Sequence, residues 1–239
     1  MKPVLIVTHL PDRADGLVRA CLEEAGCAVI ECNPADAEPL PETSEISGVV
    51  SLGGRQSATR VDADPFLAAE TELMAQALER DIPVLGMCLG AQLLAVATGG
   101  RVRAAGHMNA GWPDLELLPA GHSDPVFGGF PARLPVLKWH EDIIDLPPGA
   151  VELATTPGPG AALFRVGSRG WGSQAHVELT PAMLDGWLTD PADIAEIENA
   201  GHDIAGFRAA SGGHLEAQMA AARPMFRAFG ALTCALTSA

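Results

Sequence analysis

The feature of this sequence that most limits its fold is an apolar strand pattern that runs directly into a helix pattern. The strand-like run Pro83–Met87 leads without a spacer into the apolar helical segment Leu89–Thr98, which the pair Gly99-Gly100 closes. An earlier run, Ile46–Leu52, is apolar over most of its length, as expected for a strand covered on both faces of a parallel sheet. This order predicts βαβ units.

The same alternation of strand and helix patterns extends over the first hundred residues. Val4–His9 and Ala28–Cys32 are strand-like, and a helix with an apolar face follows Asp64-Pro65. We therefore predict an α/β fold with three layers, in which helices cover both faces of a mostly parallel central sheet. Later pieces, separated by proline and glycine turns, indicate antiparallel edge additions: Leu115–Leu118, Val136–Trp139, Val151–Ala154, Ala162–Val166 and Gly172–His176.

The C-terminal part of the chain is predicted to be helical. Thr180-Pro181 opens one helix, and the alanine-rich tail from Pro191 continues as helix except at Ser211-Gly212-Gly213 and Pro224, where we expect breaks. A chain of 239 residues fits one sizeable domain. We predict a main domain over residues 1–190 and a helical extension over residues 191–239 that packs on the same domain.

The charge balance and the cysteine pattern exclude several classes of protein. Fifteen lysines and arginines against 30 acidic residues give a net charge of −15, which would repel a phosphate backbone and an anionic bilayer, so we expect neither nucleic acid nor membrane as a partner. The five cysteines form no C-x-x-C pair and no zinc-ribbon spacing, which favours a reducing, cytoplasmic location. No segment approaches the roughly 20 apolar residues of a membrane span.

Cys88 stands where the strand pattern meets the helix pattern. Residues Gly86–Gly90 read G-M-C-L-G, the form of a nucleophile elbow, in which glycines permit a turn too tight for Cβ atoms. The sulfur would then lie at a helix N-terminus, where free N–H groups favour the thiolate. We predict Cys88 to be a nucleophile. The other four cysteines are interpreted as small core residues: Cys21, Cys27, Cys32 and Cys234.

A cysteine nucleophile needs a base, and His176 is the candidate among seven histidines because Glu178 follows two residues later. In extended chain the two side chains project to the same side, so the carboxylate can hold one ring nitrogen while the other faces the sulfur. By itself H-x-E is more often a surface pair. It also occurs in zinc deaminases, but these require a following P-C-x-x-C that this chain lacks, so we expect no metal.

A glycine pair after the earlier buried strand is the third element of the predicted site. Ser51-Leu52-Gly53-Gly54 is either a simple turn or a source of exposed N–H groups for a developing negative charge. With the N–H of Leu89, this loop would supply the two donors of an oxyanion hole.

On these residues the chain resembles the class I glutamine amidotransferases, and within them the stand-alone proteins described as GMP-synthase-like. The resemblance covers about residues 3–190 and implies that residues 1–190 are a glutamine amidotransferase catalytic domain with a flavodoxin-like sheet. Its most specific block is P-V-L-G-M-C-L-G-A-Q-L-L-A at 83–95. The supporting blocks are S-L-G-G at 51–54, D-P-F-L at 64–67, G-G-R-V at 99–102, G-W at 111–112, K-W-H-E-D at 138–142 and L-P-P-G-A at 146–150.

The resemblance also implies a role for each matching residue. Cys88 would be the thiolate, His176 the acid and base, and Glu178 the residue that orients the imidazole. The backbone of Gly54 and Leu89 would hold the oxyanion. The substrate's amino-acid end would lie against Gln92 and Gly53, and near His140, unless His140 is only a satisfied polar residue beside Trp139.

The implied reaction is hydrolysis of the side-chain amide of glutamine, or of a γ-glutamyl compound, through a γ-glutamyl thioester that releases ammonia. No metal or organic cofactor is expected. The sequence contains no ATP-using module, so a separate ammonia-accepting synthetase or simple release of ammonia both stay open, and so does a homodimer.

Three residues depart from the family's usual pattern. Arg55 replaces the proline after the glycine pair, and Ala175 and Val177 replace the aromatic residue and the proline of Q-F-H-P-E. These changes spare the reacting groups but would loosen the turn around His176. Two alternatives therefore remain: a catalytically weak or inactive binding or regulatory subunit, and a cysteine hydrolase, acting on γ-glutamyl peptides or, in the manner of dienelactone hydrolases, on esters.

Overall fold

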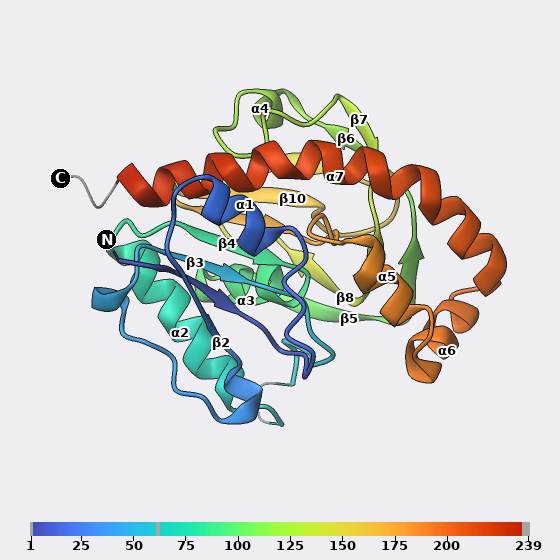
Figure 1. Ribbon diagram of the computed structural model, residues 1–239, viewed down its shortest axis with the longest axis horizontal. Coiled ribbons are helices and arrows are strands. Elements are labelled where there is room, and N and C mark those ends of the chain that lie inside the picture. Colours follow the sequence, from blue (N-terminus) through green and yellow to red (C-terminus); the bar gives the residue numbers. More distant parts are fainter. Residues whose placement is uncertain (1, 61–62, 236–239) are drawn as a thin grey trace.

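A nine-stranded sheet forms the centre of the protein in the computed structural model, which describes residues 2–60 and 63–235 (Figure 1). The order of its strands is β2-β1-β3-β4-β11-β10-β9-β6-β7. Their bounds are β1 Val4–Val7, β2 Val29–Cys32, β3 Gly48–Ser51, β4 Val84–Met87, β6 Asp114–Leu117, β7 Arg133–Pro135, β9 Val151–Thr155, β10 Leu163–Val166 and β11 Gly170–Ser173.

The first five strands of this order run parallel to one another, and the others are antiparallel. In β1, β3 and β4 every residue is buried, which explains their apolar sequences. In the register of the sheet, Val7 pairs with Ser51, and Met87 pairs with Ser173. The carboxyl ends of four neighbouring parallel strands therefore meet at one edge.

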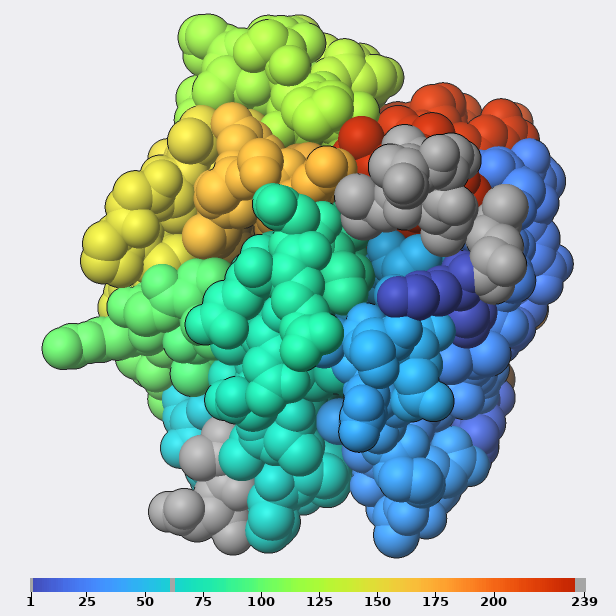
Figure 2. All heavy atoms as spheres, turned by 90° about the vertical axis from the view of Figure 1, so that its left-hand side faces the viewer, coloured from blue at the N-terminus to red at the C-terminus, as the bar shows by residue number. Residues whose placement is uncertain are grey.

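Helices cover both faces of the sheet, as predicted for a three-layer α/β fold. Helices α1 (Val18–Glu24) and α7 (Ile204–Ala235) pack together on one face, and α2 (Phe66–Glu79) and α3 (Leu89–Ala97) on the other. In Figure 2 the turquoise α2 forms the middle of one side of the molecule, while the red α7 appears only at its upper edge. Two hydrophobic clusters lie between these layers and the sheet.

The remaining elements surround one end of the sheet. Strands β5 (Arg101–Gly111) and β8 (Lys138–Asp145) form a separate antiparallel ribbon. Helices α5 (Pro181–Trp187) and α6 (Pro191–Asn199) lie near it, and a third hydrophobic cluster joins β8, α5, α6 and the start of α7. Short helical turns occur at α4 (Pro119–His122), η1 (Pro34–Asp36) and η2 (Thr43–Glu45).

The predicted edge position of Gly172–His176 is wrong. Strand β11 lies in the middle of the sheet, where it pairs parallel with β4 and antiparallel with β10. Its glycines have no apolar side chains, so a hydrophobicity pattern does not indicate that the strand is buried. A Cβ on Gly172 would lie 2.3 Å from the ring of Phe164. The phenylalanine ring thus fills the space that a strand side chain would take.

The predicted strand Val136–Trp139 is also interrupted, since β7 ends at Pro135 and β8 begins at Lys138. The backbone N–H of Val136 instead donates to the carbonyl of Pro113. The long strand Arg101–Gly111 was not anticipated, because most of its residues are exposed or half-buried and carry no apolar alternation.

Helix α7 continues through both of its expected breaks, at Ser211-Gly212-Gly213 and at Pro224. The hydroxyl of Ser211 donates to the carbonyl of Phe207 at 2.7 Å and accepts from Trp112 Nε1 at 2.8 Å. These two hydrogen bonds hold the serine within the helix. Burial of Met225, Phe226 and Phe229 against the sheet stabilises the helix beyond the proline. No helix within the described part of the chain has both the length and the apolar character needed to cross a bilayer.

Candidate active site

The candidate site lies where the four parallel strands β1, β3, β4 and β11 end. His9 follows β1, Gly53 follows β3, Cys88 follows β4, and His176 follows β11. Because these strands are neighbours with aligned carboxyl ends, residues from four distant parts of the sequence meet at one place, the usual location of a site in an open α/β sheet.

Cys88 occupies a strained backbone position between β4 and α3. Its φ is 48° and its ψ is −104°, a conformation that non-glycine residues rarely adopt. The residues two positions before and after it must be glycines, since a Cβ on Gly86 would lie 2.3 Å from the carbonyl oxygen of Gly90, and one on Gly90 would lie 2.2 Å from that of Ser51. The predicted elbow is therefore present as a local structure.

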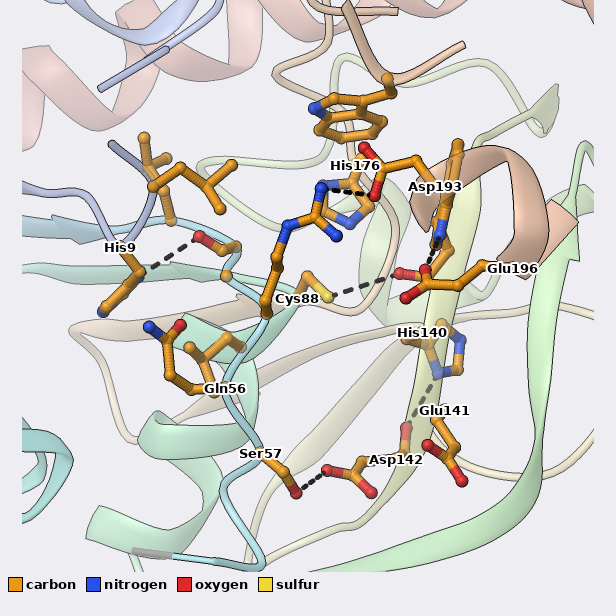
Figure 3. A pocket seen from close by; sticks show the side chains of 18 of the residues that line it. His9, Gln56, Ser57, Cys88, His140, Glu141, Asp142, His176, Asp193 and Glu196 are labelled. Carbon is orange, nitrogen blue, oxygen red and sulfur yellow. Dashed lines mark hydrogen bonds and ion pairs between the residues drawn. The ribbon is translucent and has the colours of Figure 1, made fainter. Parts of the chain in front are cut away.

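The sulfur of Cys88 lies in a polar environment at the wall of a cavity. Its Sγ is 3.8 Å from the carbonyl oxygen of Trp139 and 3.7 Å from Nε2 of Gln174. The residue is 6% exposed, and that surface faces the cavity (Figure 3). Cys88 is thus accessible to a small molecule that enters the cavity, in contrast to a cysteine sealed in the core.

His176 and Glu178 are joined as the sequence predicts, although through a different backbone. Nδ1 of His176 is 2.8 Å from Oε1 of Glu178, and both side chains are buried. The segment is a turn and not extended chain, and the N–H of Val177 donates to the carbonyl of Ala175. The assumption of an extended chain is therefore wrong, but a turn brings the two side chains together equally well.

Contacts with distant segments replace the missing proline and aromatic residue of this turn. The N–H of His176 donates to the carbonyl of Leu137, and Nε2 of Gln218 on α7 donates to the carbonyl of His176. Ala175 and Val177 are buried in the cluster beneath α7. The position of His176 is therefore fixed by the residue before β8 and by α7.

The imidazole of His176 faces two acidic partners. Burial by itself would lower the pKa of His176, but the charges of Cys88 and Glu178, with hydrogen bonds to both, outweigh burial and raise that pKa well above its usual value. The ring also packs edge-on against Trp187, with 5.0 Å between ring centroids. These contacts favour the imidazolium form of His176.

Gly53 and Gly54 lie close to the reacting groups. A Cβ on Gly53 would be 2.7 Å from Cε1 of His176 and 3.6 Å from Cβ of Cys88, whereas one on Gly54 would be 2.9 Å from Cδ2 of Leu89. Only glycine leaves enough room for the backbone at these positions. The loop, the nucleophile candidate and Leu89 are thus brought together as predicted from the sequence.

Gln92 and His140 present unused hydrogen-bonding atoms. Oε1 of Gln92 and Nε2 of His140 are buried and have no hydrogen-bond partner among the described residues, and both residues line the cavity. Burial and the charge of Lys138 lower the pKa of His140 to about 3, although its Nδ1 donates to the carbonyl of Asp142. His140 is therefore neutral near pH 7 and offers Nε2 as an acceptor.

The cavity has a volume of about 740 Å³. Its lining includes several acidic residues: Glu141, Asp142, Asp190, Asp193 and Glu196. Arg55, on the loop after Gly54, reaches Asp193 on α6, with 2.7 Å between Nη2 and Oδ1. Burial raises the pKa of Asp193 to about 6, although Arg55 opposes this. Within the described residues no cluster of three or more histidine, cysteine or acidic side chains could hold a metal.

A second buried pair next to the site is missing from the sequence predictions. Nε2 of His9 is 2.7 Å from Oε2 of Glu70 on α2, and both side chains are fully buried. Ser51 donates to Oε1 of Glu70 at 2.6 Å. One signal could have revealed the pair, since Glu70 lies on the apolar face of α2 between Leu67 and Met74, where a charged residue needs a partner.

Comparison with known proteins gives the same family for the whole region. The family described as "Glutamine amidotransferase class-I" matches residues 14–186. A Salmonella typhimurium protein named as glutamine amidotransferase-like protein YfeJ is 30% identical over 77% of this chain and 79% of its own length. The glutamine-hydrolysing GMP synthase of Thermomicrobium roseum is 38% identical over 62% of this chain, but the match spans only 27% of that protein.

A solved structure is similar over nearly the full length. The crystal structure of a glutamine amidotransferase from Thermotoga maritima has a TM-score of 0.84 and 27% identity, and the match covers 96% of this chain and 98% of that one. Fold, family pattern and relatives agree: this chain belongs to the class I glutamine amidotransferase family.

Proposed function

We propose that this protein hydrolyses the side-chain amide of glutamine, or of a γ-glutamyl compound, with Cys88 as nucleophile, His176 as acid and base, and Glu178 as the group that orients His176. The observation that carries the proposal is the strained Cys88 on a cavity wall, beside an imidazole that a buried carboxylate holds at 2.8 Å. Membership of the amidotransferase family supports it.

The first half-reaction forms a thioester and releases ammonia. The Cys88 thiolate attacks the amide carbonyl carbon, and the carbonyl electrons move to oxygen, which the N–H groups of Gly54 and Leu89 stabilise. As the carbonyl reforms, the C–N bond breaks, and the His176 imidazolium gives its proton to the departing nitrogen. Glu178 accepts a hydrogen bond from the Nδ1–H of His176 throughout and keeps Nε2 directed at the reacting atoms.

The second half-reaction restores the enzyme. Neutral His176 takes a proton from water, the hydroxide adds to the thioester carbonyl, and the C–S bond breaks. The new γ-carboxylic acid loses its proton to the solvent and leaves as glutamate or the corresponding γ-carboxylate, and the pair of thiolate and imidazolium returns. His176 carries the proton that is transferred in each half-reaction.

The unused atoms in the cavity support the assignment of substrate contacts. Oε1 of Gln92 and Nε2 of His140 are acceptors with no partner within residues 2–60 and 63–235, and both suit the ammonium group and N–H groups of an amino-acid end. Gly53 leaves open backbone space next to Cys88 for that part of the substrate.

The fate of the ammonia belongs to the same proposal. The match between this chain and the relative named as a GMP synthase spans only 27% of that protein. We infer that a separate ammonia-accepting synthetase is one outlet. Direct release is the other, and the cavity of about 740 Å³ has room for a γ-glutamyl compound larger than glutamine.

Ammonia release from glutamine and a panel of γ-glutamyl amides tests the function. We expect turnover of at least one of these by wild-type protein and none by Cys88→Ser. The matched control is Cys32→Ser, because Cys32 is a buried cysteine at the end of β2, where burial with Glu38 and Glu70 raises its pKa to about 11. Equal activity of Cys88→Ser and Cys32→Ser would contradict the proposal.

A further inference from the structure

His9 lies beside the Gly53–Gly54 loop and has no part in the reaction steps above. It follows β1 and is 3% exposed. Its Nε2 is 2.7 Å from Glu70, and its Nδ1 is 3.3 Å from the carbonyl oxygen of Gly53. The ring also stacks on Phe66, with 6.4 Å between centroids. A buried, titratable side chain is therefore attached directly to the loop proposed to hold the oxyanion.

Both ring nitrogens of His9 face hydrogen-bond acceptors. A peptide carbonyl can only accept, so Nδ1 must carry a proton to bond Gly53. Glu70 already accepts a hydrogen bond from the hydroxyl of Ser51 through its other oxygen. Burial alone would lower the pKa of His9, but the charge and hydrogen bond of Glu70 outweigh burial, and that pKa is raised. The geometry therefore suits an imidazolium with two donors.

The bond to Gly53 sets the direction of the next N–H group. The C=O of Gly53 and the N–H of Gly54 belong to one trans peptide and so point in opposite directions. Figure 3 shows His9 and Cys88 on opposite sides of the carbonyl that His9 binds. With the carbonyl held by His9, the N–H of Gly54 points toward the side of the loop where Cys88 lies.

We propose that His9, held by Glu70, is a positioning residue of the oxyanion hole: it anchors the carbonyl of Gly53 and thereby directs the N–H of Gly54 at the developing oxyanion. A peptide between two glycines flips easily, because neither residue has a Cβ to restrict it. A charge-assisted hydrogen bond is stronger than a neutral one and opposes the flip. This inference rests on the proposed function, since it explains what orients the Gly54 N–H, one of the two proposed oxyanion donors.

Two substitutions separate the bonds that His9 makes. In His9→Asn the side-chain amide can reproduce the Nδ1 donor to Gly53 while the contact with Glu70 is lost. In His9→Gln the longer amide can reproduce the Nε2 donor to Glu70 while the contact with Gly53 is lost. A purely structural role would make the variant that keeps Glu70 paired the better one. The positioning role predicts the reverse.

We expect His9→Gln to lower kcat for amide hydrolysis about 10-fold or more, since removing an oxyanion donor costs roughly 100-fold to 1,000-fold. KM should change by less than about 3-fold, because the contact acts in the transition state. His9→Asn should have a kcat about 5-fold or more above that of His9→Gln, because it keeps the Gly54 N–H directed at the oxyanion.

The rate at which iodoacetamide alkylates Cys88 distinguishes a positioning role of His9 from damage to the fold. This reaction displaces iodide from a saturated carbon and forms no oxyanion, so its rate in His9→Gln should stay within about 3-fold of wild type while kcat falls. A kcat of His9→Gln equal to wild type, or a kcat of His9→Asn no higher than that of His9→Gln, would overturn the proposal. If alkylation slows as much as kcat, the role is structural and the proposal is also wrong.

Nitrogen NMR of the wild-type protein tests the inference without depending on how the variants fold. Nδ1 of His9 should carry a proton at pH 8, and an unprotonated Nδ1 would overturn the proposal. Failure of the function is recognised separately, because wild-type protein would then release no ammonia from any amide of the panel, whatever the state of His9.

Discussion

Two buried histidine–glutamate pairs flank the Gly53–Gly54 loop, and they differ in what the second ring nitrogen meets. In His176–Glu178 the contact is 2.8 Å, and the other face of the ring is directed at Cys88. In His9–Glu70 the contact is 2.7 Å, and the other nitrogen meets a main-chain carbonyl. The same pair of side chains can therefore serve proton transfer or hold a peptide in place.

The comparison shows that a buried carboxylate alone does not identify a catalytic histidine. Both pKa values are raised against the effect of burial. In the proposed mechanism a proton leaves His176 for a reacting atom of the substrate, whereas both ring nitrogens of His9 face protein groups that take no part in the reaction. The neighbour on the far side of the ring decides the role.

Removal of the His176 ring should have the largest effect on turnover. His176→Ala should lower kcat by about 10³-fold or more, because general acid and base catalysis is lost in both half-reactions. The exposed His122, far from the cavity lining, gives the matched control His122→Ala, which should not change kcat. Steady-state ammonia release measures both. A loss of less than about 10-fold in His176→Ala would remove the distinction between the two pairs.

The pH dependence of turnover tests the charge on His176. Because the pKa of His176 is raised, the imidazolium persists above pH 6.5, and kcat should fall only as the pH rises through the raised value. Glu178→Gln removes one of the two charges that raise it, so this alkaline decline should move to lower pH. The same variant should lower kcat by roughly 100-fold. An alkaline decline that stays in place would argue that Glu178 does not act on His176.

The stability of the folded protein should depend more on Glu70 than on Glu178. Glu70→Ala leaves His9 charged and Ser51 unpaired in a fully buried site, which should cost about 3 kcal/mol or more of unfolding free energy. Glu178→Ala should cost less, about 1–2 kcal/mol, because His176 keeps Cys88 as a partner. Urea unfolding at pH 6 and pH 9 measures both.

The sign of the pH effect on stability follows from the raised pKa of His9. Stabilisation by its charged form is complete below the unfolded value near 6.5 and is lost as the pH rises through the folded value. The difference between wild type and Glu70→Ala should therefore shrink at pH 9. A difference that grows with pH would show that His9 is neutral in the folded protein.

The smallest predicted effect concerns the ion pair across the cavity. Arg55→Ala removes the contact with Asp193, and about half of the Arg55 side chain is exposed, so the pair contributes at most about 1 kcal/mol. We expect the kcat/KM ratio of a bulky γ-glutamyl amide to glutamine to rise about 2-fold to 5-fold as the cavity opens. Arg55→Lys, which keeps the charge, is the control. A fall in this kcat/KM ratio would contradict the prediction that the ion pair restricts the space for bulky substrates.

The sequence predicts what is local and misses what depends on distant packing. The elbow at Cys88 and the pair His176–Glu178 each lie within five residues, so both could be predicted from short motifs together with the family resemblance. His9 and Glu70 are 61 positions apart, and nothing in the sequence near His9 indicates a partner. Strand β11 was placed at an edge because its glycines yield space to Phe164, and the length of α7 depends on burial that overrides a proline.

Several expectations stay predictions. The division of the chain at residue 190 is one, and residues on both sides of it line the same cavity, among them His176 and Asp193. A homodimer and a cytoplasmic location are others. Each depends on measurements on the protein in solution or in the cell.

Acid-quenched turnover tests the central claim most directly. Wild-type protein mixed with the accepted amide, stopped in acid within one turnover and digested, should yield the peptide that contains Cys88 with one γ-glutamyl group bound through sulfur, and hydroxylamine should remove it. Ammonia release at the full wild-type rate with no modified Cys88 peptide at any time, and with undiminished turnover in Cys88→Ser, would contradict the account.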